Sequence, residues 1–441
     1  KDEKQKFPTL LLILSDFNIM KYLSILILLL LSFSVKAQQI LTLEECYSMV
    51  NENYPLTRQT DQLKNKTDLE ISALGKGKLP KVDLNAQATY QSEVIEFPFQ
   101  LPNSSIEPLN KDQYRATLDV NQLIYNGGSI DASSKLKKAE LEAQQQMVAV
   151  NLYQLKNRVN QSYFSVLLLQ EQKNLLVLKQ EQLRSQIDEV KTGVKFGAIL
   201  PASENVLEAE NLKVSQQLSQ VNFDRKKSLN NLSELINKEL SQDLILSKTE
   251  FPNLLTSTFL RPELQYFDLQ KKQIESSKEV ISSSNSPKVY GFAQAGYGKP
   301  GLNMLDNSFQ DFYMVGLKVN WNVFDWGKIK AQKQALSVSQ EIVDTEKESF
   351  QLNNDMQLKE ADYEISKIEA LIEADNEIII LREKVLKSAT SQLKNGVITS
   401  SEYLTEFNSL YESMISQKLH EIQLDLARAN YKVIKGETNS K

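Results

Sequence analysis

Cysteine, histidine, glycine and proline are all scarce in this chain of 441 residues. A single cysteine, Cys46, excludes a disulfide within the chain, and the single histidine, His420, leaves no set of ligands for a cysteine–histidine zinc site. A Cys–His dyad would require these two residues to meet. Glycine (14 residues) and proline (11 residues) together reach about half of their usual share. Sandwich and α/β folds need more turn residues, so the composition favours long, uninterrupted helices.

The chain also lacks a net positive charge, and long apolar runs are scarce. The chain has 51 basic and 56 acidic residues, a net charge of −5 and a pI near 5.4, which argue against a nucleic-acid partner. One apolar run, Leu23–Leu31, follows Met20-Lys21 and precedes the small-residue site Val35-Lys36-Ala37. This order predicts a secretory signal peptide over residues 20–37, cut after Ala37, whereas a membrane anchor needs a longer run. Residues 1–19 contain no methionine, and we expect them to lie upstream of the true start.

The chain repeats itself once. Residues 80–90 (PKVDLNAQATY) and residues 287–297 (PKVYGFAQAGY) are identical at seven of eleven positions, at an offset of 207. After a variable loop the offset becomes 199, where Gly128 matches Gly327. An ordered series of such matches predicts a tandem duplication with a join near residues 240–260.

Each half is predicted to hold the same parts in the same order: a first helix, two strands, a very long helix, a short turn and a returning helix. The first repeat covers residues 38–240, a linker or equatorial segment covers 241–260, the second repeat covers 261–436, and 437–441 form a tail. Helices longer than sixty residues measure roughly 90–100 Å, and apolar positions spaced by threes and fours predict antiparallel coiled-coil hairpins. The predicted helices are residues 42–77, 129–192, 202–251, 262–284, 328–395 and 397–435.

Four segments of about nine or ten residues alternate apolar and polar side chains, and each is long enough to cross a bilayer as a tilted strand. In the first, Val82 and Leu84 alternate with Asp83 and Asn85. The other three lie near residues 114–121, 289–297 and 313–321. Aromatic residues at the ends of the apolar face form a predicted membrane-interface girdle: Tyr90, Tyr114, Tyr297, Tyr313 and Trp321.

Two interpretations of these strands remain open at this level. A soluble antiparallel sheet with one wet face gives the same alternation. The signal peptide, and the lack of any other apolar run of about 18 residues, favour a membrane. Membrane strands must close into a barrel, and four are too few because natural barrels begin at about eight. The chain must then associate, as a dimer with eight strands or as a trimer with twelve strands, a passage and a matching ring of twelve helices.

Several short motifs then resemble the TolC-like outer-membrane efflux proteins, also called outer membrane factors, over nearly all of residues 40–435. Each motif is weak alone, but their order in both halves is specific. They are Leu41-Thr42-Leu43-Glu44-Glu45, Leu79-Pro80, Leu123-Ile124-Tyr125-Asn126-Gly127-Gly128, Leu260-Arg261-Pro262-Glu263-Leu264 and Val323-Phe324-Asp325-Trp326-Gly327. The resemblance implies a homotrimer with a twelve-stranded β-barrel among the lipids of a Gram-negative outer membrane, continued by an α-helical barrel across the periplasm.

The resemblance also implies a function and partners. Such proteins are the passive exit ducts of tripartite efflux pumps and type I secretion systems. A periplasmic adaptor (membrane fusion) protein meets the hairpin tips and connects them to an inner-membrane RND or ABC-type transporter. No cofactor, metal or enzymatic activity is expected. The predicted tip residues for adaptor contact are Gly197, Ala198, Ile199, Leu200, Pro201, Asn395, Gly396, Val397 and Ile398.

In this family, acidic side chains just after the second tip ring the pore constriction. Glu402 matches the first such position, the second position is occupied by Thr405 with Glu406 beside it, and Glu204 takes the matching place in the first half. An ordinary structural role is the alternative for Glu402 and Glu204, because acids in the first turn of a helix complement its dipole.

The closed state of family members is also locked by a tyrosine and an arginine that flank the second tip glycine. Those positions hold Leu393 and Ile398 here, so any polar lock must use other residues. His420 lies on a charged, periodic helix and is predicted to be a plain surface residue.

Two other functions are alternatives to the duct. A periplasmic adaptor, or another non-channel hairpin protein, should carry one hairpin on a single β-rich core, whereas this sequence predicts two hairpins and four amphipathic strands. A secreted enzyme or binding protein on a helical scaffold would need a polar site in a loop-rich pocket, which the sequence does not offer. The transported substrate is not specified by any of these residues.

Overall fold

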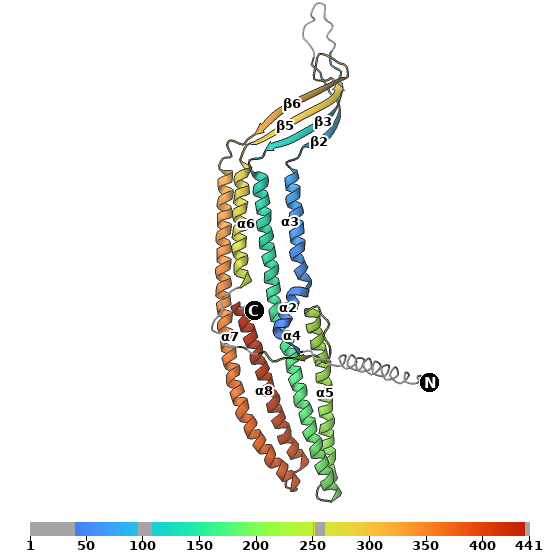
Figure 1. Cartoon of the computed structure of the whole chain (residues 1–441), viewed down its shortest axis with the longest axis vertical. Coiled ribbons are helices and arrows are strands. Elements are labelled where there is room, and N and C mark those ends of the chain that lie inside the picture. The colour runs from blue at the N-terminus through green and yellow to red at the C-terminus, as the bar shows by residue number, and fades with distance from the viewer. Residues whose placement is uncertain (1–39, 96–107, 250, 252–260, 437–441) are drawn as a thin grey trace, which may run out of the picture.

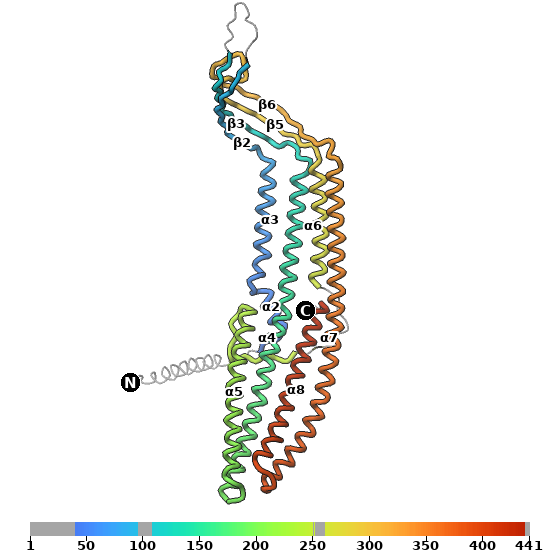
Figure 2. Tube along the Cα trace, turned by 180° about the vertical axis from the view of Figure 1, so that it is seen from behind, coloured from blue at the N-terminus to red at the C-terminus, as the bar shows by residue number. Residues whose placement is uncertain are grey.

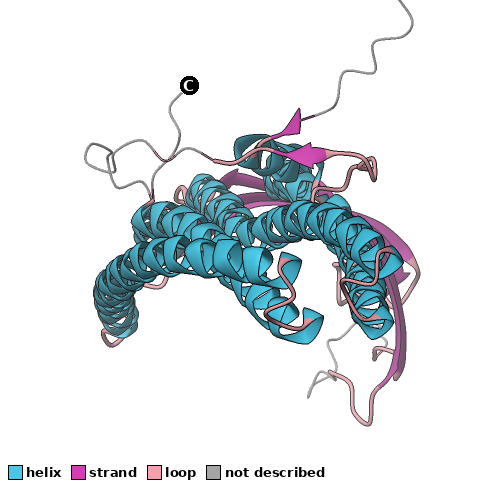
Figure 3. Ribbon diagram, turned by 90° about the horizontal axis from the view of Figure 1, so that it is seen from below, coloured by secondary structure: helices cyan, strands magenta, loops and turns pink. Residues whose placement is uncertain are grey.

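The computed structural model describes residues 40–95, 108–249, 251 and 261–436. The predicted signal peptide, the upstream extension and the tail beyond residue 436 lie outside these residues. Long helices run side by side along most of the molecule, and a small sheet lies at one end (Figure 1). Seen along the long axis, the helices form a curved layer (Figure 3).

Two very long helices form the frame of the molecule. Helix α4 (Ser129–Lys195) and helix α7 (Lys328–Lys394) each have 67 residues. In the half away from the sheet, α5 (Pro201–Leu235) runs back along α4, and α8 (Ser400–Lys435) runs back along α7, so that each pair is an antiparallel hairpin (Figure 2). We name α4 with α5 the first hairpin, and α7 with α8 the second.

The half nearer the sheet has different companion helices. Helix α3 (Arg58–Lys76) lies beside α4, and α6 (Pro262–Ser284) lies between α4 and α7 (Figures 1 and 2). The single helix predicted over residues 42–77 is wrong in one respect. It is divided into α2 (Leu43–Asn53), a 3-10 turn (Pro55–Thr57) and α3. Proline lacks a backbone N–H and favours the first turn of a new helix, which explains a break at Pro55.

The predicted returning helix over residues 202–251 was also too long, because α5 ends at Leu235. Asn237 adopts a left-handed conformation with φ of 50°, and the amide of Lys238 donates back to the carbonyl of Ser233. This is the helix-ending motif that glycine usually makes and that asparagine also tolerates. Beyond it, β4 (Ile245–Leu246) pairs in parallel with β1 (Ile40–Leu41). This pairing joins the segment after α5 to the start of the described chain.

A four-stranded antiparallel sheet lies beyond the helices. Its strands are β2 (Lys81–Tyr90), β3 (Asp112–Tyr125), β5 (Lys288–Lys299) and β6 (Gln310–Asn320), in the order β2-β3-β5-β6. Directly paired residues of an antiparallel sheet share a face. The register pairs Leu84 with Leu118, Leu118 with Ala295, and Ala295 with Tyr313, so the predicted apolar positions of all four strands lie on one face.

The largest apolar core lies in the middle of the molecule, where α2, α4, α5, α8 and the two short strands meet. Tyr163 and Phe164 are almost fully buried there, as is Cys46. Burial raises the pKa of the Cys46 thiol to about 12, so the thiol stays protonated at neutral pH. Cys46 therefore packs as a small buried hydrophobic residue. No helix in the described part of the chain is both long enough and apolar enough to span a bilayer.

Candidate functional site

The two hairpin tips have the same backbone design. Gly197 and Gly396 both adopt left-handed conformations, with φ of 73° and 69°. In each tip the amide of the following residue donates to a carbonyl five positions earlier, Ala198 to Gly193 and Val397 to Gln392. This arrangement satisfies carbonyls that the helix end leaves free, and glycine takes it without steric strain.

The structure brings the predicted tip residues to one end of the molecule, at the bottom of Figure 1. Their apolar side chains divide into two groups. Leu200 and Val397 are 75% and 71% exposed, as is Phe196 (78%), which the sequence analysis did not select. Ile199 and Ile398 instead pack inward against the tip core described next.

The tip core is a buried cluster to which all four helices of the two hairpins contribute. Leu393, one of the positions where a polar lock was considered, is only 2% exposed within this cluster, so it packs rather than locks. Tyr403, Phe407 and Tyr411 follow one another along α8, with ring centroids 5.7 and 5.0 Å apart. The remaining members are Leu176, Leu183, Ile187, Val190, Leu207, Val214, Ala389 and Leu404.

Polar contacts cross this apolar seam between the hairpins. The Tyr411 hydroxyl donates to Oε1 of Gln182 on α4 at 2.9 Å. Lys179 of α4 lies 3.3 Å from Glu210 of α5, and both side chains are at least nine-tenths buried. The Lys179 ammonium also lies 5.9 Å from the ring centroids of Phe407 and Tyr411 on the second hairpin. The cation is therefore held by a carboxylate of its own hairpin and by aromatic faces of the other.

Glu402, the first predicted gate acid, caps its own helix. Its carboxylate accepts hydrogen bonds from the backbone amide of Thr399 at 2.8 Å and from the Thr399 hydroxyl at 2.9 Å. The Glu402 amide donates in return to the Thr399 hydroxyl, which completes a capping box. The Thr399 amide, more than the hydroxyl, lowers the pKa of the Glu402 carboxyl below its usual range, because a hydrogen bond to the charged form favours it.

The other predicted gate residues also have partners. Glu204 lies 3.9 Å from Lys191 of α4. The Thr405 hydroxyl donates along its helix to the carbonyl of Ser401. Glu406 forms an ion pair of 3.1 Å with Arg382 of α7, a residue that the sequence analysis missed because it lies 24 positions away. Whether these side chains ring a constriction in an assembly stays a prediction.

The apolar face of the sheet is open. Leu84 and Leu317 are 79% and 72% exposed. Tyr114, Tyr297 and Tyr313 lie on this face near the loop end of their strands, and Tyr90 ends β2. Trp321 lies at the helical end, where its indole donates to the carbonyl of Asn285. Phe309 belongs with the tyrosines and was missed because it precedes β6. Its ring centroid is 5.4 Å from that of Tyr297 and 6.2 Å from that of Tyr114.

The opposite face of the sheet carries a network of polar side chains that spans β2, β3 and β5, together with some apolar side chains of β5 and β6 such as Phe292 and Phe312. Asp119 accepts from Asn85 at 2.7 Å, from Thr117 at 2.9 Å and from Gln294 at 2.5 Å, and so links β2, β3 and β5. Arg115 lies 5.5 Å from the centroid of the Phe312 ring. This face has the character of a wall that borders water.

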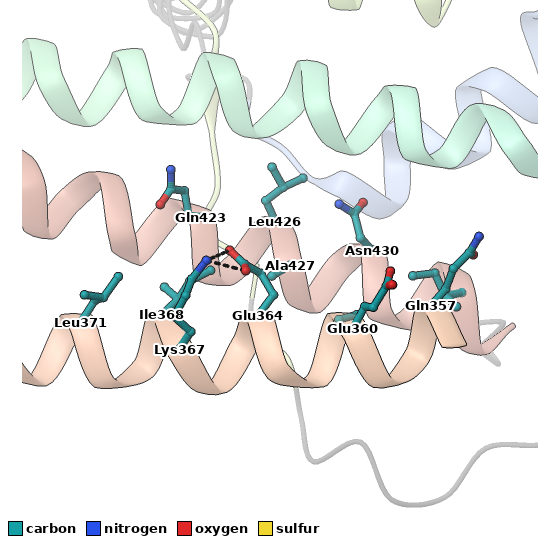
Figure 4. Close-up of a pocket in the computed structure, with 12 residues that line it drawn as sticks. Gln357, Glu360, Glu364, Lys367, Ile368, Leu371, Gln423, Leu426, Ala427 and Asn430 are labelled. Carbon is teal, nitrogen blue, oxygen red and sulfur yellow. Dashed lines mark hydrogen bonds and ion pairs between the residues drawn. The ribbon is translucent and has the colours of Figure 1, made fainter. Parts of the chain in front are cut away.

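A cleft of about 650 Å³ lies between α7 and α8 (Figure 4). Glu360, Glu364 and Lys367 line it from α7, and Gln423 and Asn430 line it from α8. Lys367 and Glu364 pair with each other, so two of the charges in the cleft are already matched. Among the described residues, no group of three or more acidic, histidine or cysteine side chains is arranged to hold a metal ion.

His420 is not the plain surface residue that the sequence predicted. Its Nδ1 lies 2.6 Å from Oδ2 of Asp375 on α7, and both side chains are largely buried, with 19% and 11% exposed. Periodicity alone could not show this contact, because the two residues lie 45 positions apart in the sequence and on different helices.

Comparison with known proteins finds one family that resembles part of this chain. Residues 47–238 match the model of the outer membrane efflux protein family. Over this part, the chain is similar to the outer-membrane efflux proteins. None of the curated proteins matches the sequence.

Solved structures of membrane channels and outer-membrane proteins share the fold over most of this chain. CusC is 13% identical with a TM-score of 0.65, and the similarity covers 92% of this chain and 93% of CusC. VceC of Vibrio cholerae is 15% identical with a TM-score of 0.60, covering 89% and 96%. The MtrE outer membrane channel of Neisseria gonorrhoeae, solved in an open state, is 17% identical with a TM-score of 0.62, covering 89% of each chain. At these identities the similarity establishes the fold alone.

Proposed function

We propose that this chain is an outer-membrane efflux protein and forms the exit duct of a tripartite efflux pump or a type I secretion system. It would conduct substrates passively through a shared pore, with a gate at the hairpin tips. The observation that carries the proposal is the sheet, whose apolar face is exposed and whose polar face is networked. A soluble sheet would cover its apolar face with other elements of the chain. An outward apolar face and an inward polar face are the pattern of an outer-membrane barrel.

The sheet also supports a homotrimer. Strands β2 and β6 are its two edges, and each has one side without a partner strand in the chain. Unpaired strand edges do not occur in the hydrocarbon of a membrane, so each edge needs another chain. Pairing β6 of one copy with β2 of the next is a head-to-tail contact, which closes into a ring. Three copies would supply twelve strands, and the curved helical layer would supply the matching wall of the duct (Figure 3).

The gate is proposed at the seam between the hairpins. At the tips this seam is held by the tip core, by the Tyr411–Gln182 hydrogen bond and by Lys179 beneath two aromatic rings. Moving the second hairpin away from the first would break the two polar contacts first and widen the passage. Glu402 would then contribute to a ring of three carboxylates that attracts cations.

The tips are also the proposed contact for a periplasmic adaptor. Phe196, Leu200 and Val397 expose apolar side chains at the far end of the helices, where water would otherwise surround them. An adaptor bound there would connect the duct to an inner-membrane RND or ABC-type transporter, which would supply the energy and the choice of substrate.

Insertion of the purified protein into planar bilayers tests the proposal. We expect stepwise conductance, and a native mass of three chains in mild detergent. A matched pair of variants tests the orientation of the sheet. Leu84→Arg places a charge on the proposed lipid face, whereas Asn85→Arg places it on the proposed lumen face of the same strand. Near the membrane midplane an arginine on the lipid face costs about 2–4 kcal/mol, so Leu84→Arg should abolish insertion and Asn85→Arg should only change conductance. A soluble monomer, or equal tolerance of both variants, would refute the duct.

A further inference from the structure

Two junctions between the sheet and the long helices share one backbone geometry but carry different residues. Before α4 the chain passes through Gly127 and Gly128, with φ of 64° and 79°. Before α7 it passes through Trp326 and Gly327, with φ of 55° and 82°. Trp326 thus occupies the position that Gly127 occupies in the first half.

The side chain before each pair fixes the same turn. Asn126 Oδ1 accepts a hydrogen bond of 3.0 Å from the amide of Gly128. Asp325 Oδ1 accepts one of 3.0 Å from the amide of Gly327. The two turns therefore share this contact, and Asp325 accepts a second hydrogen bond of 3.0 Å from the amide of Ile329. Between the turns, glycine is exchanged for tryptophan.

Tryptophan is a poor choice for this backbone. A left-handed conformation is open to glycine, but in a bulky residue it is a steric outlier. Such a strained conformation persists only where the surrounding structure enforces it, often at a binding or contact site. Within the chain, however, the Trp326 side chain is 89% exposed and packs edge-on against Phe324 with centroids 4.7 Å apart. The strained backbone therefore projects a large apolar ring outward from the described chain.

The first junction shows where that ring points. A Cβ added at Gly127 would lie 2.1 Å from the Cβ of Ser286, which precedes the neighbouring strand β5. A side chain at this position is thus directed at the segment that opens the next strand of the sheet. For Trp326 the next strand lies beyond the edge strand β6, outside the chain.

The residue that corresponds to Ser286 in the other half is Leu79. Both precede the same sequence, Pro-Lys-Val, which opens β2 in one case and β5 in the other. Leu79 is 61% exposed and lies at the opposite edge of the sheet from Trp326. In a head-to-tail ring, these two edges meet.

We infer that Trp326 of one copy of the chain packs against Leu79 of the next copy and anchors the ring at the junction of sheet and helices. This inference rests on the proposed homotrimer and names the contact that holds its copies together. Gly127 lets the segment at Ser286 approach closely within one chain, whereas the indole would fill a wider gap between chains. A tryptophan seated against a leucine and shielded from water is typical of the few residues that dominate an interface.

Subunit exchange between differently labelled trimers in mild detergent tests the anchor. Trp326→Gly removes the ring but keeps a residue suited to the backbone, so a folding defect is not expected. It should speed exchange about tenfold, as should Leu79→Ala, and the double variant should add little to either. Trp326→Tyr is the matched control, since it keeps an aromatic ring, and it should exchange like the parent protein. Unchanged exchange in Trp326→Gly would overturn the inference.

A disulfide test separates this inference from the proposed trimer. Because Cys46 is fully buried, Trp326→Cys combined with Leu79→Cys can be oxidised with the native thiol in place. We expect covalent trimers from the double variant and single chains from each single variant. A protein whose native mass is that of one chain would refute the trimer itself. A stable trimer that gives no cross-link would refute only the Trp326–Leu79 contact. In Trp321→Phe, where Trp326 is the only tryptophan, strong quenching by brominated lipid would assign the ring to the membrane instead.

Discussion

The Tyr411 hydroxyl donates a hydrogen bond of 2.9 Å to Gln182 and so joins the second hairpin to the first. Burial raises the pKa of Tyr411 to about 12, so the hydroxyl remains a donor throughout the physiological range. A hydrogen bond of this kind contributes about 1 kcal/mol, or about fivefold in an equilibrium. If the gate opens at this seam, the contact favours the closed state.

Removing that hydroxyl should therefore favour opening. We expect Tyr411→Phe to raise the open probability in single-channel recordings about fivefold. Tyr403→Phe is the matched control, because Tyr403 bonds to Thr390 of its own hairpin and not across the seam. Equal effects of the two substitutions would show that general loosening of the tip, and not the seam contact, controls opening.

The buried pair Lys179–Glu210 predicts a non-additive effect on stability. Lys179→Met leaves the Glu210 carboxylate in the seam without its main partner, which should lower the free energy of unfolding by about 3 kcal/mol. Lys213 is 3.8 Å from the same carboxylate and, being mostly exposed, offsets little of this. Lys179→Met combined with Glu210→Leu replaces both charges with apolar groups and should return close to the parent protein. Thermal unfolding followed by helical circular dichroism measures the stability of the single and double variants. A double variant less stable than Lys179→Met alone would contradict the pairing.

The alternation of side chains was sufficient to predict the strands. Because strand side chains alternate with a period of two, residues such as Leu84 and Asn85 assign the two faces before any pairing is known. The offset between the halves could likewise predict that the tips share one glycine turn. The strand alternation and the glycine turn are both local features, because the energetic preferences behind them act within a few residues.

The missed features depend on contacts that are distant in sequence or on less common conformations. The end of α5 at Leu235 depends on Asn237, whose left-handed conformation is less predictable than that of a glycine. His420 became part of a pair because Asp375 lies opposite it on another helix. Glu402 was assigned to a pore from resemblance, whereas its nearest partner is the local cap residue Thr399. For an assembly, the missing information lies in the other copies of the chain.

Asp425 on α8 predicts a dependence of stability on pH. Burial raises its pKa to about 6, against the opposing effects of Arg428 and Lys248, and Glu421 raises it further. A carboxyl with a raised pKa binds its proton more tightly in the folded state, so its contribution is present at low pH and is lost as pH rises through about 6. Asp425→Asn should therefore stabilise the protein at pH 8 by about 1 kcal/mol, allowing for partial exposure, and should have little effect at pH 4. Unfolding temperatures of the parent protein and of Asp425→Asn between pH 4 and pH 8 test this pH dependence. A gain in stability that is the same at every pH would show that the charge of Asp425 is not its cause.

The capping and gating roles of Glu402 can be separated by mutation. The cap depends on both Glu402 and Thr399, whereas the proposed gate depends only on the charge of Glu402. Glu402→Gln removes the charge, so divalent cations should block single-channel current about tenfold less tightly if the three carboxylates form a ring. Thr399→Ala removes the cap, costs the start of α8 about 1 kcal/mol, and leaves the charge in place, so block should persist. The Thr399 amide and, to a lesser extent, the Thr399 hydroxyl lower the pKa of the Glu402 carboxyl. Thr399→Ala removes only the hydroxyl, so block in the parent protein should survive acidification to a slightly lower pH than in this variant. Unchanged block in Glu402→Gln would leave Glu402 as a helix cap alone, since a cap acts on α8 within its own chain and requires no ring.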